Sequence, residues 1–476
     1  MGSEWRKVKL EEVASEVTVG YVGSMTSEYI ESGVPFLRSK NVDPFTVNLD
    51  DIKYISPEFN EKLKKSALAP GDVVIVRTGK PGTCAVIPDW LESANCSDLV
   101  IVRCGPEINN RFLAYYVNTV ASSHVNAHLV GAVQQHFNVG SAKLMELSLP
   151  SLEVQEQIVS ILSALDNKIA LNRQINTTLE SMAQALFKSW FVDFDPVIDN
   201  ALAAGHDIPD ELQARAARRR ALRGSDSEGE SNAETRTHPQ GPTHPADVQQ
   251  HFPDRFVFTE DMGWVPEGWE VVTLKEMTQK IGSGATPRGG QSVYQESGIS
   301  LIRSQNIYDS DFVWDGLAFI TDEAALQLKN VEVMEGDVLI NITGASILRT
   351  CIVEPSVLPA RVNQHVAIIR PKSGVPSRYL HLHLLNQKIK NHLMAQNAGA
   401  SREAVTKGHL EAVPVLQPDS KVLSFFERYT VGMTDKSLAC GASSKTLVDL
   451  RDSLLPKLLS GQITIPDAEQ VLDEVL

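Results

Sequence analysis

The side chains in this sequence that are best suited to binding occur in a short phrase that is present twice. Arg38–Asn41 reads Arg-Ser-Lys-Asn, and Arg303–Asn306 reads Arg-Ser-Gln-Asn, 265 residues later (303 − 38 = 265). Guanidinium and carboxamide groups make paired hydrogen bonds, but they are not the nucleophiles or general bases of an enzyme site. The phrase therefore raises the question of why one chain carries these side chains twice, so far apart.

No catalytic motif accompanies this phrase. The sequence lacks G-x-x-x-x-G-K-[ST], H-E-x-x-H and G-x-S-x-G. It also lacks an Asn/Asp-Pro-Pro-aromatic tetrapeptide, because Asp193–Val197 contains only one proline. The glycine-rich stretch Gly282–Gly290 is predicted to be a loop. His381, His383 and His392 are spaced as polar points on a helix rather than as metal ligands. The sequence therefore shows no catalytic constellation.

The repeated phrase belongs to a duplication that covers nearly the whole chain. Three further pairs of phrases recur in the same order: WRKVKLEEV at Trp5 and WEVVTLKEM at Trp269, GDVVIVRTG at Gly71 and GDVLINITG at Gly336, TLESMAQALF at Thr178 and TLVDLRDSLL at Thr446. Chance matches would scatter, whereas these keep their order at an almost constant offset. The chain therefore consists of two copies of one unit.

Each copy begins with a region of short strands and helices. The apolar, β-branched runs 72–77 and 99–104 are matched by 337–342 and 366–371, and Gly, Pro or Asp residues bound them. Helical stretches are predicted at 110–120 and 377–394. This pattern predicts a mixed α+β globule in each copy.

Each copy ends in a long helix whose heptad positions are mostly apolar. Residues 153–191 contain no Gly or Pro. The heptad positions are Ile158, Leu165, Asn172, Leu179 and Leu186 in the first copy, and Phe426, Met433, Cys440, Leu447 and Leu454 in the second. A strict seven-residue repeat predicts a coiled-coil seam, whereas a helix that packs on its own globule would follow a period of 3.6.

Antiparallel pairing would bring these heptad positions together in reverse order. Ile158 would meet Leu454, and the least apolar residues, Asn172 and Cys440, would meet at the centre. A slip by one heptad would bury the Asn172 amide against an apolar partner, at a cost of about 1–3 kcal/mol. Parallel pairing could also bring Asn172 beside Cys440, but a two-fold axis that relates the two copies requires antiparallel helices.

A linker separates the copies. The sequence predicts a short helix from about Asp210 to Gly224, with five arginines from Arg215 to Arg223. These arginines could form a DNA-contacting patch or a solvated helix face. Residues 225–250 contain almost no large apolar side chain and are expected to be flexible or disordered.

The composition narrows the class of protein. A net charge of −15 argues against a free-standing, non-specific nucleic-acid binder, which would normally be basic. It does not exclude a protein that places a few basic side chains locally, or one that acts within a complex. The five cysteines form no C-x-x-C pair, so a reducing cytoplasm is expected. No apolar run approaches the ~18–20 residues of a membrane span, and no signal peptide is evident at the N-terminus.

With these pieces in order, the sequence resembles the specificity subunit of a Type I restriction–modification system. The resemblance rests on the W-x-x-x-x-L openings at Trp5 and Trp269, on FLRSKNV and LIRSQNI, on PGDVVIVRTG and EGDVLINITG, on the segment 147–197, on MGWVPEGWEV and on LRDSLLPKLLSGQI. The linker is the least typical part. The second copy also has PDSKVLSFF where the first has PSLEVQEQI, and so lacks a close match to its Glu-Gln pair.

The resemblance implies an α+β fold with two similar mixed α/β target-recognition domains. Two long helices would separate them and form an antiparallel coiled coil with pseudo-two-fold symmetry. The expected boundaries are 1–150 for target-recognition domain 1, 151–195 for the central spacer helix, 196–262 for a partly disordered linker, 263–418 for target-recognition domain 2, 419–462 for the C-terminal spacer helix and 463–476 for a tail.

The resemblance also implies a function without catalysis in this chain. Each domain would read one half of a bipartite, asymmetric sequence in double-stranded DNA. The chain would recruit two modification (methyltransferase) subunits and two restriction (motor-nuclease) subunits in the cytoplasm. It would need no cofactor; S-adenosylmethionine, ATP and Mg would belong to the partners.

The two copies divide the candidate DNA-binding residues into two groups. Arg38, Asn41, Arg303 and Asn306 could contact guanine, adenine or phosphate, but shared residues cannot explain different half-sites, so folding or backbone contact is the preferred interpretation. Base reading is expected where the copies differ. The candidates are Lys40 against Gln305, Arg77 and Lys80 against Asn341 and Ser346, and Gln134, Gln135 and His136 against Ser401 and Arg402.

Two other classes remain as alternatives. An enzyme whose site is built from both copies would need convergent titratable groups, which the sequence does not show. A coiled-coil scaffold without direct base reading is favoured slightly by the acidic charge, and salt-dependent duplex binding by the complex would exclude it.

Overall fold

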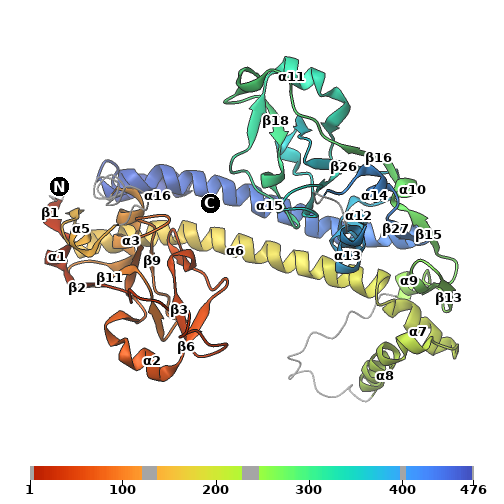
Figure 1. Cartoon of the computed structure of the whole chain (residues 1–476), viewed down its shortest axis with the longest axis horizontal. Coiled ribbons are helices and arrows are strands. Elements are labelled where there is room, and N and C mark those ends of the chain that lie inside the picture. Colours follow the sequence, from red (N-terminus) through yellow and green to blue (C-terminus); the bar gives the residue numbers. More distant parts are fainter. Residues whose placement is uncertain (1–4, 121–136, 228–245, 397–403, 474–476) are drawn as a thin grey trace. The chain divides into compact units, whose positions relative to one another are not determined.

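The structure is a computed structural model that describes residues 5–120, 137–227, 246–396 and 404–473. The chain divides into two units, Met1–Arg173 with Ala442–Leu476, and Gln174–Gly441. Each unit contains one α/β domain and part of both long helices (Figure 1). Within the described ranges, no helix combines the length and the hydropathy that crossing a bilayer requires.

The first domain extends from β1 to β12 and contains two four-stranded sheets. The inner sheet has the order β2-β11-β8-β9, formed by Ala14–Val19, Leu99–Cys104, Val73–Val76 and Cys84–Val86. The outer sheet has the order β6-β3-β10-β7, formed by Lys53–Ile55, Val34–Leu37, Ala94–Cys96 and Ala67–Leu68. Two further pairs are β1 with β12 and β4 with β5, formed by Arg6–Lys9, Glu146–Leu149, Val42–Asp43 and Thr46–Val47. The helices are α1 (Leu10–Val13), α2 (Pro57–Lys62), α3 (Asn110–Thr119) and α5 (Val139–Lys143).

The second domain extends from β15 to β27 and repeats this topology. Its inner sheet has the order β16-β26-β23-β24, formed by Thr278–Ser283, Val366–Pro371, Val338–Asn341 and Thr350–Ile352. Its outer sheet has the order β17-β21-β18-β25-β22, formed by Tyr294–Gln295, Ala318–Ile320, Ile299–Ile302, Ala360–Val362 and Glu332–Val333. The two further pairs are β15 with β27 and β19 with β20, formed by Glu270–Thr273, Pro414–Gln417, Ile307–Tyr308 and Asp311–Phe312. The predicted duplication and the four predicted inner strands are confirmed.

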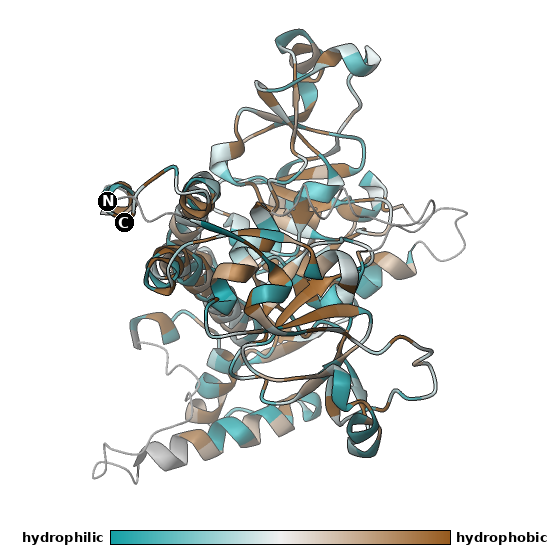
Figure 2. Ribbon diagram, turned by 90° about the vertical axis from the view of Figure 1, so that its left-hand side faces the viewer, coloured by the Kyte–Doolittle hydropathy of each residue, from teal (hydrophilic) through white to brown (hydrophobic). Residues whose placement is uncertain are grey.

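The inner sheet of each domain is buried on both faces, which explains its uninterrupted apolar strands. Side chains alternate between the faces of a strand. In β8, Val73 and Ile75 belong to a core shared with the long helices, whereas Val74 and Val76 belong to a core beneath the outer sheet. In Figure 2 the strands inside the domains are accordingly coloured mainly as hydrophobic.

The long helices are α6 (Leu152–Phe191) and α15 (Ser420–Leu459), and they are antiparallel. In the first unit, Ile158 near the start of α6 shares a core with Leu454 near the end of α15. In the second unit, Phe187 near the end of α6 packs on Phe426 near the start of α15, with ring centroids 6.2 Å apart. The mixed α/β domains and the paired long helices confirm the expected fold class.

Part of the linker is ordered around α7 (Asp195–Ala204) and α8 (Gln213–Ser227). Arg215 makes two 2.6 Å hydrogen bonds to Asp195, and Arg219 makes an equivalent pair of bonds to Asp199. These two arginines therefore join helices, which neither sequence interpretation anticipated. The expected helix end at Gly224 is wrong, because an interior glycine costs a helix only about 1 kcal/mol. Residues 228–245 lie outside the described part of the chain.

The helical stretch expected at 377–394 is present as two helices, α12 (Ser377–Leu385) and α13 (Gln387–Ala395), because Asn386 is extended and its side chain caps α13. His381 and His383 lie on α12, and both are buried. The His383 Nε2 atom lies 2.9 Å from the Pro414 carbonyl oxygen. Burial lowers the pKa of both imidazoles to about 4.

Candidate nucleic-acid interface

The shared asparagine closes the same tight turn in each domain. The Asn41 Oδ1 atom accepts a 3.1 Å hydrogen bond from the Arg38 amide, and its Nδ2 atom donates to the Asp50 carbonyl at 3.0 Å. Asn306 accepts from the Arg303 amide at 3.0 Å and also donates to backbone carbonyls downstream. Both asparagines are fully buried. Their amides are used by the backbone, which leaves them unable to reach a base in this conformation.

The shared arginine braces the loop that follows the turn. The Nη2 atom of Arg38 donates to the carbonyl of Asp51, and that of Arg303 donates to the carbonyl of Gly316. Both acceptors have left-handed backbones, with φ of 46° and 67°. The Nε atoms of both arginines are buried without a hydrogen-bond partner. Both arginines therefore brace this loop through a backbone carbonyl, and Arg38 also pairs with the Asp51 carboxylate at 3.3 Å.

The residues that differ around this turn change its charge. In the first domain, the carboxylate of Asp51 accepts from Lys40, and from Lys53 at 3.0 Å. These hydrogen bonds, first from Lys40, hold the pKa of Asp51 well below its usual range. In the second domain, Gln305 donates to the Gly316 carbonyl at 3.2 Å. One turn therefore presents two lysines around a carboxylate, and the other presents a neutral amide.

The other described candidates lie at one end of the inner sheet. Arg77 follows β8 and donates to Asp98 at 2.5 Å and to the Phe137 carbonyl at 2.9 Å. Lys80 is exposed in the next turn. In the second domain, Asn341 is fully buried and donates to Ser346 Oγ at 3.1 Å.

Asn341 also links this sheet end to the shared turn, because it donates to the Ser304 carbonyl at 2.9 Å. The sequence candidates of the second domain that the structure describes are thus brought together. Gln134, Gln135, His136 and Arg402 lie outside the described residues.

Sequence reasoning missed two residues at this sheet end, Asp98 and His365. Asp98 immediately precedes β11, and His365 immediately precedes the equivalent strand β26. Each contacts a threonine that both domains share. The Thr78 hydroxyl donates to Asp98 at 3.2 Å, and Thr343 Oγ1 lies 2.6 Å from His365 Nδ1. The available signal was the pair of matching phrases VRTG and NITG, whose common threonine was not followed across the sheet.

The helix-seam candidates are all buried or partly buried. Ile158, Leu165, Leu447 and Leu454 belong to the core of the first unit, and Leu186, Phe426 and Met433 pack in the second. Leu179 is partly buried and Cys440 is buried. Asn172 is 4% exposed and donates to Ser443 Oγ at 3.2 Å. The buried amide therefore has a polar partner within its own unit.

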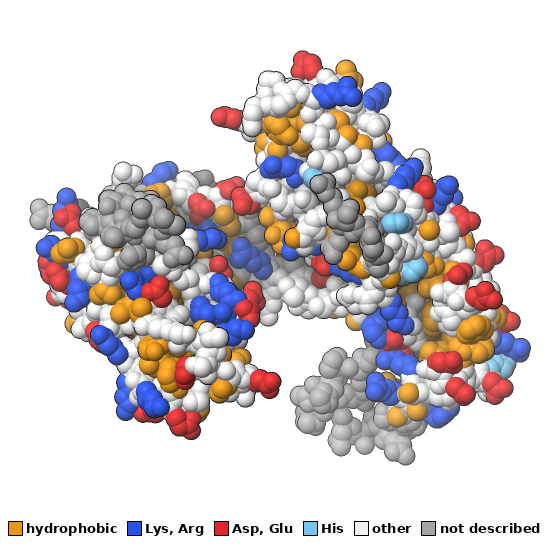
Figure 3. All heavy atoms as spheres, in the orientation of Figure 1, with side chains coloured by type: hydrophobic (Ala, Val, Ile, Leu, Met, Phe, Trp, Pro, Cys, Tyr) orange, Lys and Arg blue, Asp and Glu red, His pale blue; other side chains and the backbone are white. Residues whose placement is uncertain are grey.

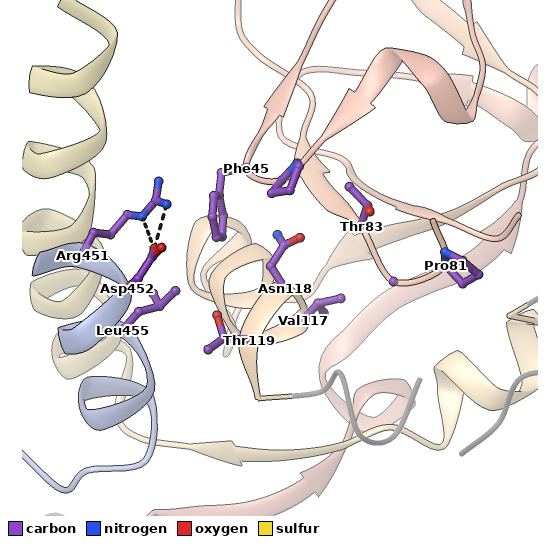
Figure 4. Close-up of a pocket in the computed structure, with 11 residues that line it drawn as sticks. Phe45, Pro81, Thr83, Val117, Asn118, Thr119, Arg451, Asp452 and Leu455 are labelled. Atoms are coloured by element: carbon purple, nitrogen blue, oxygen red, sulfur yellow. Dashed lines mark hydrogen bonds and ion pairs between the residues drawn. The ribbon is translucent and has the colours of Figure 1, made fainter. Parts of the chain in front are cut away.

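Polar contacts hold the first domain on the helices. The Tyr115 hydroxyl donates to Asp166 of α6 at 2.5 Å, and Arg451 of α15 donates to the same carboxylate at 2.9 Å. Arg451 also lies over the ring of Phe45. Figure 4 shows Arg451, Asp452 and Phe45 beside a cavity of about 520 Å³ that Asn118 also lines. The domain therefore rests on both helices of its unit.

The second domain is held by one acidic residue of α6. The carboxylate of Glu180 accepts from the Ser310 hydroxyl at 2.7 Å and from the guanidinium of Arg378. Burial would raise the pKa of this carboxyl, but Arg378 and the hydrogen bonds outweigh burial and lower it. In each unit, a carboxylate of α6 therefore binds side chains of the domain.

Side chains of both charges share the visible surface of the molecule, and Figure 3 shows the basic and acidic groups interspersed over that face. Among the described residues, no group of three or more His, Cys, Asp or Glu side chains could hold a metal ion. Burial raises the pKa of Cys104 to about 12, which disfavours a reactive thiolate there.

Comparisons with known proteins define the family. Residues 2–181 match the family model of the Type I restriction modification DNA specificity domain. The HindI specificity subunit of Haemophilus influenzae is 30% identical over 328 residues, which cover 68% of this chain and 70% of that protein. The MjaIX specificity subunit of Methanocaldococcus jannaschii is 19% identical over 474 residues, which cover 98% of this chain and 94% of that protein.

A solved structure supports the fold. The S subunit of a type I restriction–modification system from M. genitalium superposes with a TM-score of 0.51 and 11% identity, over 96% of each chain. This chain belongs to the family of type I restriction–modification specificity subunits. It is the DNA specificity subunit of such a system and a non-catalytic part of the complex.

Proposed function

We propose that this subunit reads a bipartite, asymmetric target in double-stranded DNA, with one half-site for each domain. The repeated topology carries this proposal. Two domains with matching inner sheets and the same braced turn can engage two half-sites as the subunits of a dimeric DNA-binding protein do. Their side chains differ at equivalent positions, as Lys40 and Gln305 do, so the half-sites can differ in sequence.

The subunit would act as the scaffold of a larger complex in the cytoplasm. Two modification subunits would bind it, one at each copy of the repeat, and two motor-nuclease subunits would complete the restriction enzyme. S-adenosylmethionine, ATP and Mg²⁺ would be used by those partners. With a net charge of −15, the isolated subunit should bind DNA weakly, because much of the phosphate contact would come from the partners.

Exchange of one domain tests the proposal. Residues 5–150 are replaced by the matching domain of a relative with a known target, and the hybrid is expressed with its modification subunit. Methylation-sensitive sequencing of the host should show one changed half-site and one retained half-site. A change in both half-sites would refute one domain per half-site. Native mass spectrometry of the complex measures the number of modification subunits.

A further inference from the structure

In the second domain, loops from neighbouring strands gather at one end of the inner sheet. Because β16, β26, β23 and β24 are antiparallel neighbours, the end of β16, the start of β26 and the end of β23 meet there. The turn Asn363–His365 connects the outer sheet to β26 at this end. Gln364 is exposed on that turn, and Arg288 is exposed in the loop that follows β16.

A chain of hydrogen bonds fixes the side chain of Gln364. The Thr286 hydroxyl donates to Gln364 Oε1, and Gln364 Nε2 lies 3.0 Å from His365 Nε2. An amide nitrogen only donates, so His365 Nε2 accepts and the ring proton is on Nδ1. That Nδ1 atom donates to Thr343 Oγ1 at 2.6 Å. Both ends of the amide therefore have a hydrogen-bond partner.

This arrangement leaves Gln364 with one free N–H group and one free lone pair of its carbonyl oxygen. The exposed amide can therefore still donate one hydrogen bond and accept another. In the major groove, adenine presents an N6 amino donor beside an N7 acceptor, and a glutamine amide pairs with both. A fixed amide also loses little conformational entropy on binding, which favours a specific contact.

The approach of β16 to this turn depends on a glycine. A Cβ atom at Gly284 would lie 2.1 Å from the Asn363 carbonyl oxygen, so any other residue would push the strand away. Gly20 has the same role in the first domain. The Gly20 amide donates to the Leu99 carbonyl at 2.8 Å, and the Gly284 amide donates to the Val366 carbonyl at the same distance. The backbone at this sheet end is therefore the same in both domains.

The side chains at this sheet end are not the same. Leu99 pairs with Val76 in the first domain as Val366 pairs with Asn341 in the second. Gln364 therefore corresponds to Ser97, and His365 corresponds to Asp98. The residue two positions after the shared glycine is Val22 in the first domain, 67% exposed, where the second has Thr286. The first domain thus has no amide at this position and no hydrogen bonds of this kind to orient one.

We propose that Gln364 reads an adenine in the half-site of the second domain, with Thr286 and His365 as positioning residues. This inference rests on the proposed function. It also accounts for different half-sites, because the first domain presents a serine and a carboxylate at the equivalent positions.

Base-by-base binding measurements test this inference. The specificity subunit is purified with its modification subunit, and duplexes with each base pair of the target substituted in turn are compared. In Gln364→Ala and in Gln364→Ser, which introduces the residue of the first domain, preference at one A·T pair of one half-site should fall on the order of ten- to a hundredfold. The other half-site should be unchanged. Gln417→Ala, at an exposed glutamine on β27, is the matched control and should leave every preference unchanged.

The outcomes separate this inference from the proposed function. If the wild-type complex reads a bipartite target but both Gln364 variants keep every preference within twofold, the assignment of Gln364 is refuted and the proposed function stands. If the wild-type complex has no bipartite target, the proposed function itself fails. Loss of preference in both half-sites of a Gln364 variant would also refute the assignment. His365→Ala should reduce the preference less than Gln364→Ala does, because it only loosens the amide.

Discussion

Gln155 is a fully buried amide at the joint between the first domain and α6. Its Oε1 atom accepts from the Asn109 amide at 2.8 Å, and its Nε2 atom donates to the carbonyls of Glu107 and Pro150, both at 3.0 Å. The strand pair β1–β12 of the first copy corresponds to β15–β27 of the second, and this correspondence fixes the alignment of the helices that follow. In that alignment Leu423 of α15 occupies the position of Gln155, and it is also buried. One joint is therefore polar and the other apolar.

Replacing Gln155 by leucine should destabilise the first unit. The substitution introduces the residue of the second copy, but it leaves the Asn109 N–H group and the carbonyls of Glu107 and Pro150 without this partner. The free energy of unfolding should fall by about 2–3 kcal/mol, measured by urea denaturation. Gln157→Leu, at an exposed position two residues away, is the control. Equal stability of the two variants would contradict the role of Gln155.

The buried ring of His383 should make the second unit sensitive to acid. Its pKa is lowered from 6.5 to about 4 by burial, so the unfolded state binds a proton more readily than the folded state. Its contribution to stability is therefore complete above pH 6.5 and is lost as the pH falls toward 4. At pH 5 the loss should be about 2 kcal/mol.

Urea denaturation of the wild type and of His383→Gln between pH 7 and pH 4.5 measures this effect. Glutamine can still donate to the Pro414 carbonyl but does not titrate, so the variant should lose less stability over this range. His392→Gln changes an exposed histidine and should follow the wild type. Parallel curves for the wild type and His383→Gln would contradict the prediction.

At the scale of single residues, the sequence identified which residues recur but not what their side chains contact. The shared phrase was found because Arg38 and Asn41 recur in type and spacing. Residues shared by both copies cannot explain different half-sites, so base reading was expected at other positions. The sequence does not show that Asn41 bonds to its own backbone, or that Thr343 meets His365 across the sheet. Those contacts depend on strand register, which brings distant residues together after folding.

Among the elements, the strands and the long helices were predictable because each has a strong period. Four consecutive buried residues in β8, and heptads along α6 and α15, leave little choice of secondary structure. The break at Asn386 was missed because one capping side chain decides it, within an otherwise continuous helical pattern. The Asp195–Arg215 and Asp199–Arg219 pairs were missed because they join separate helices.

The middle of α15 contains two glycines that packing does not require. A Cβ atom at Gly432 or Gly441 would meet no atom within 4 Å. Alanine should therefore stabilise the helix at each position by about 0.5–1 kcal/mol. Differential scanning calorimetry of Gly432→Ala and Gly441→Ala should show a raised Tm. Gly284→Ala is the opposing control, since its Cβ would collide with backbone and should lower the Tm. Unchanged or lowered Tm values in both helix variants would contradict the prediction.

At the scale of the whole molecule, duplication explains both the fold and its specificity. One chain supplies two domains with the same topology, so a single folding solution serves twice. The domains share internal braces at Arg38 and Arg303 and differ at exposed positions. The sequence could predict this organisation because two copies act as an alignment of the chain with itself.

The helices should set the distance between the half-sites. Each has 40 residues and is therefore about 60 Å long, comparable with one and a half turns of B-DNA. If each domain reads one half-site, the length of the helices determines which DNA spacer fits. If the domains alone read bases, as proposed above, a change in helix length should leave the bases unchanged.

An insertion of about four residues in one helix tests this ruler. Four residues add about one turn and ~6 Å, so one domain should move while the heptad contacts of each unit are largely kept. Methylation-sensitive sequencing should then show a longer spacer between two unchanged half-sites. An insertion of two residues is the control, because it turns the helix by about 200° and should abolish recognition. Altered bases with an unchanged spacer would contradict the ruler, since the insertion would then act on the domains rather than on their separation.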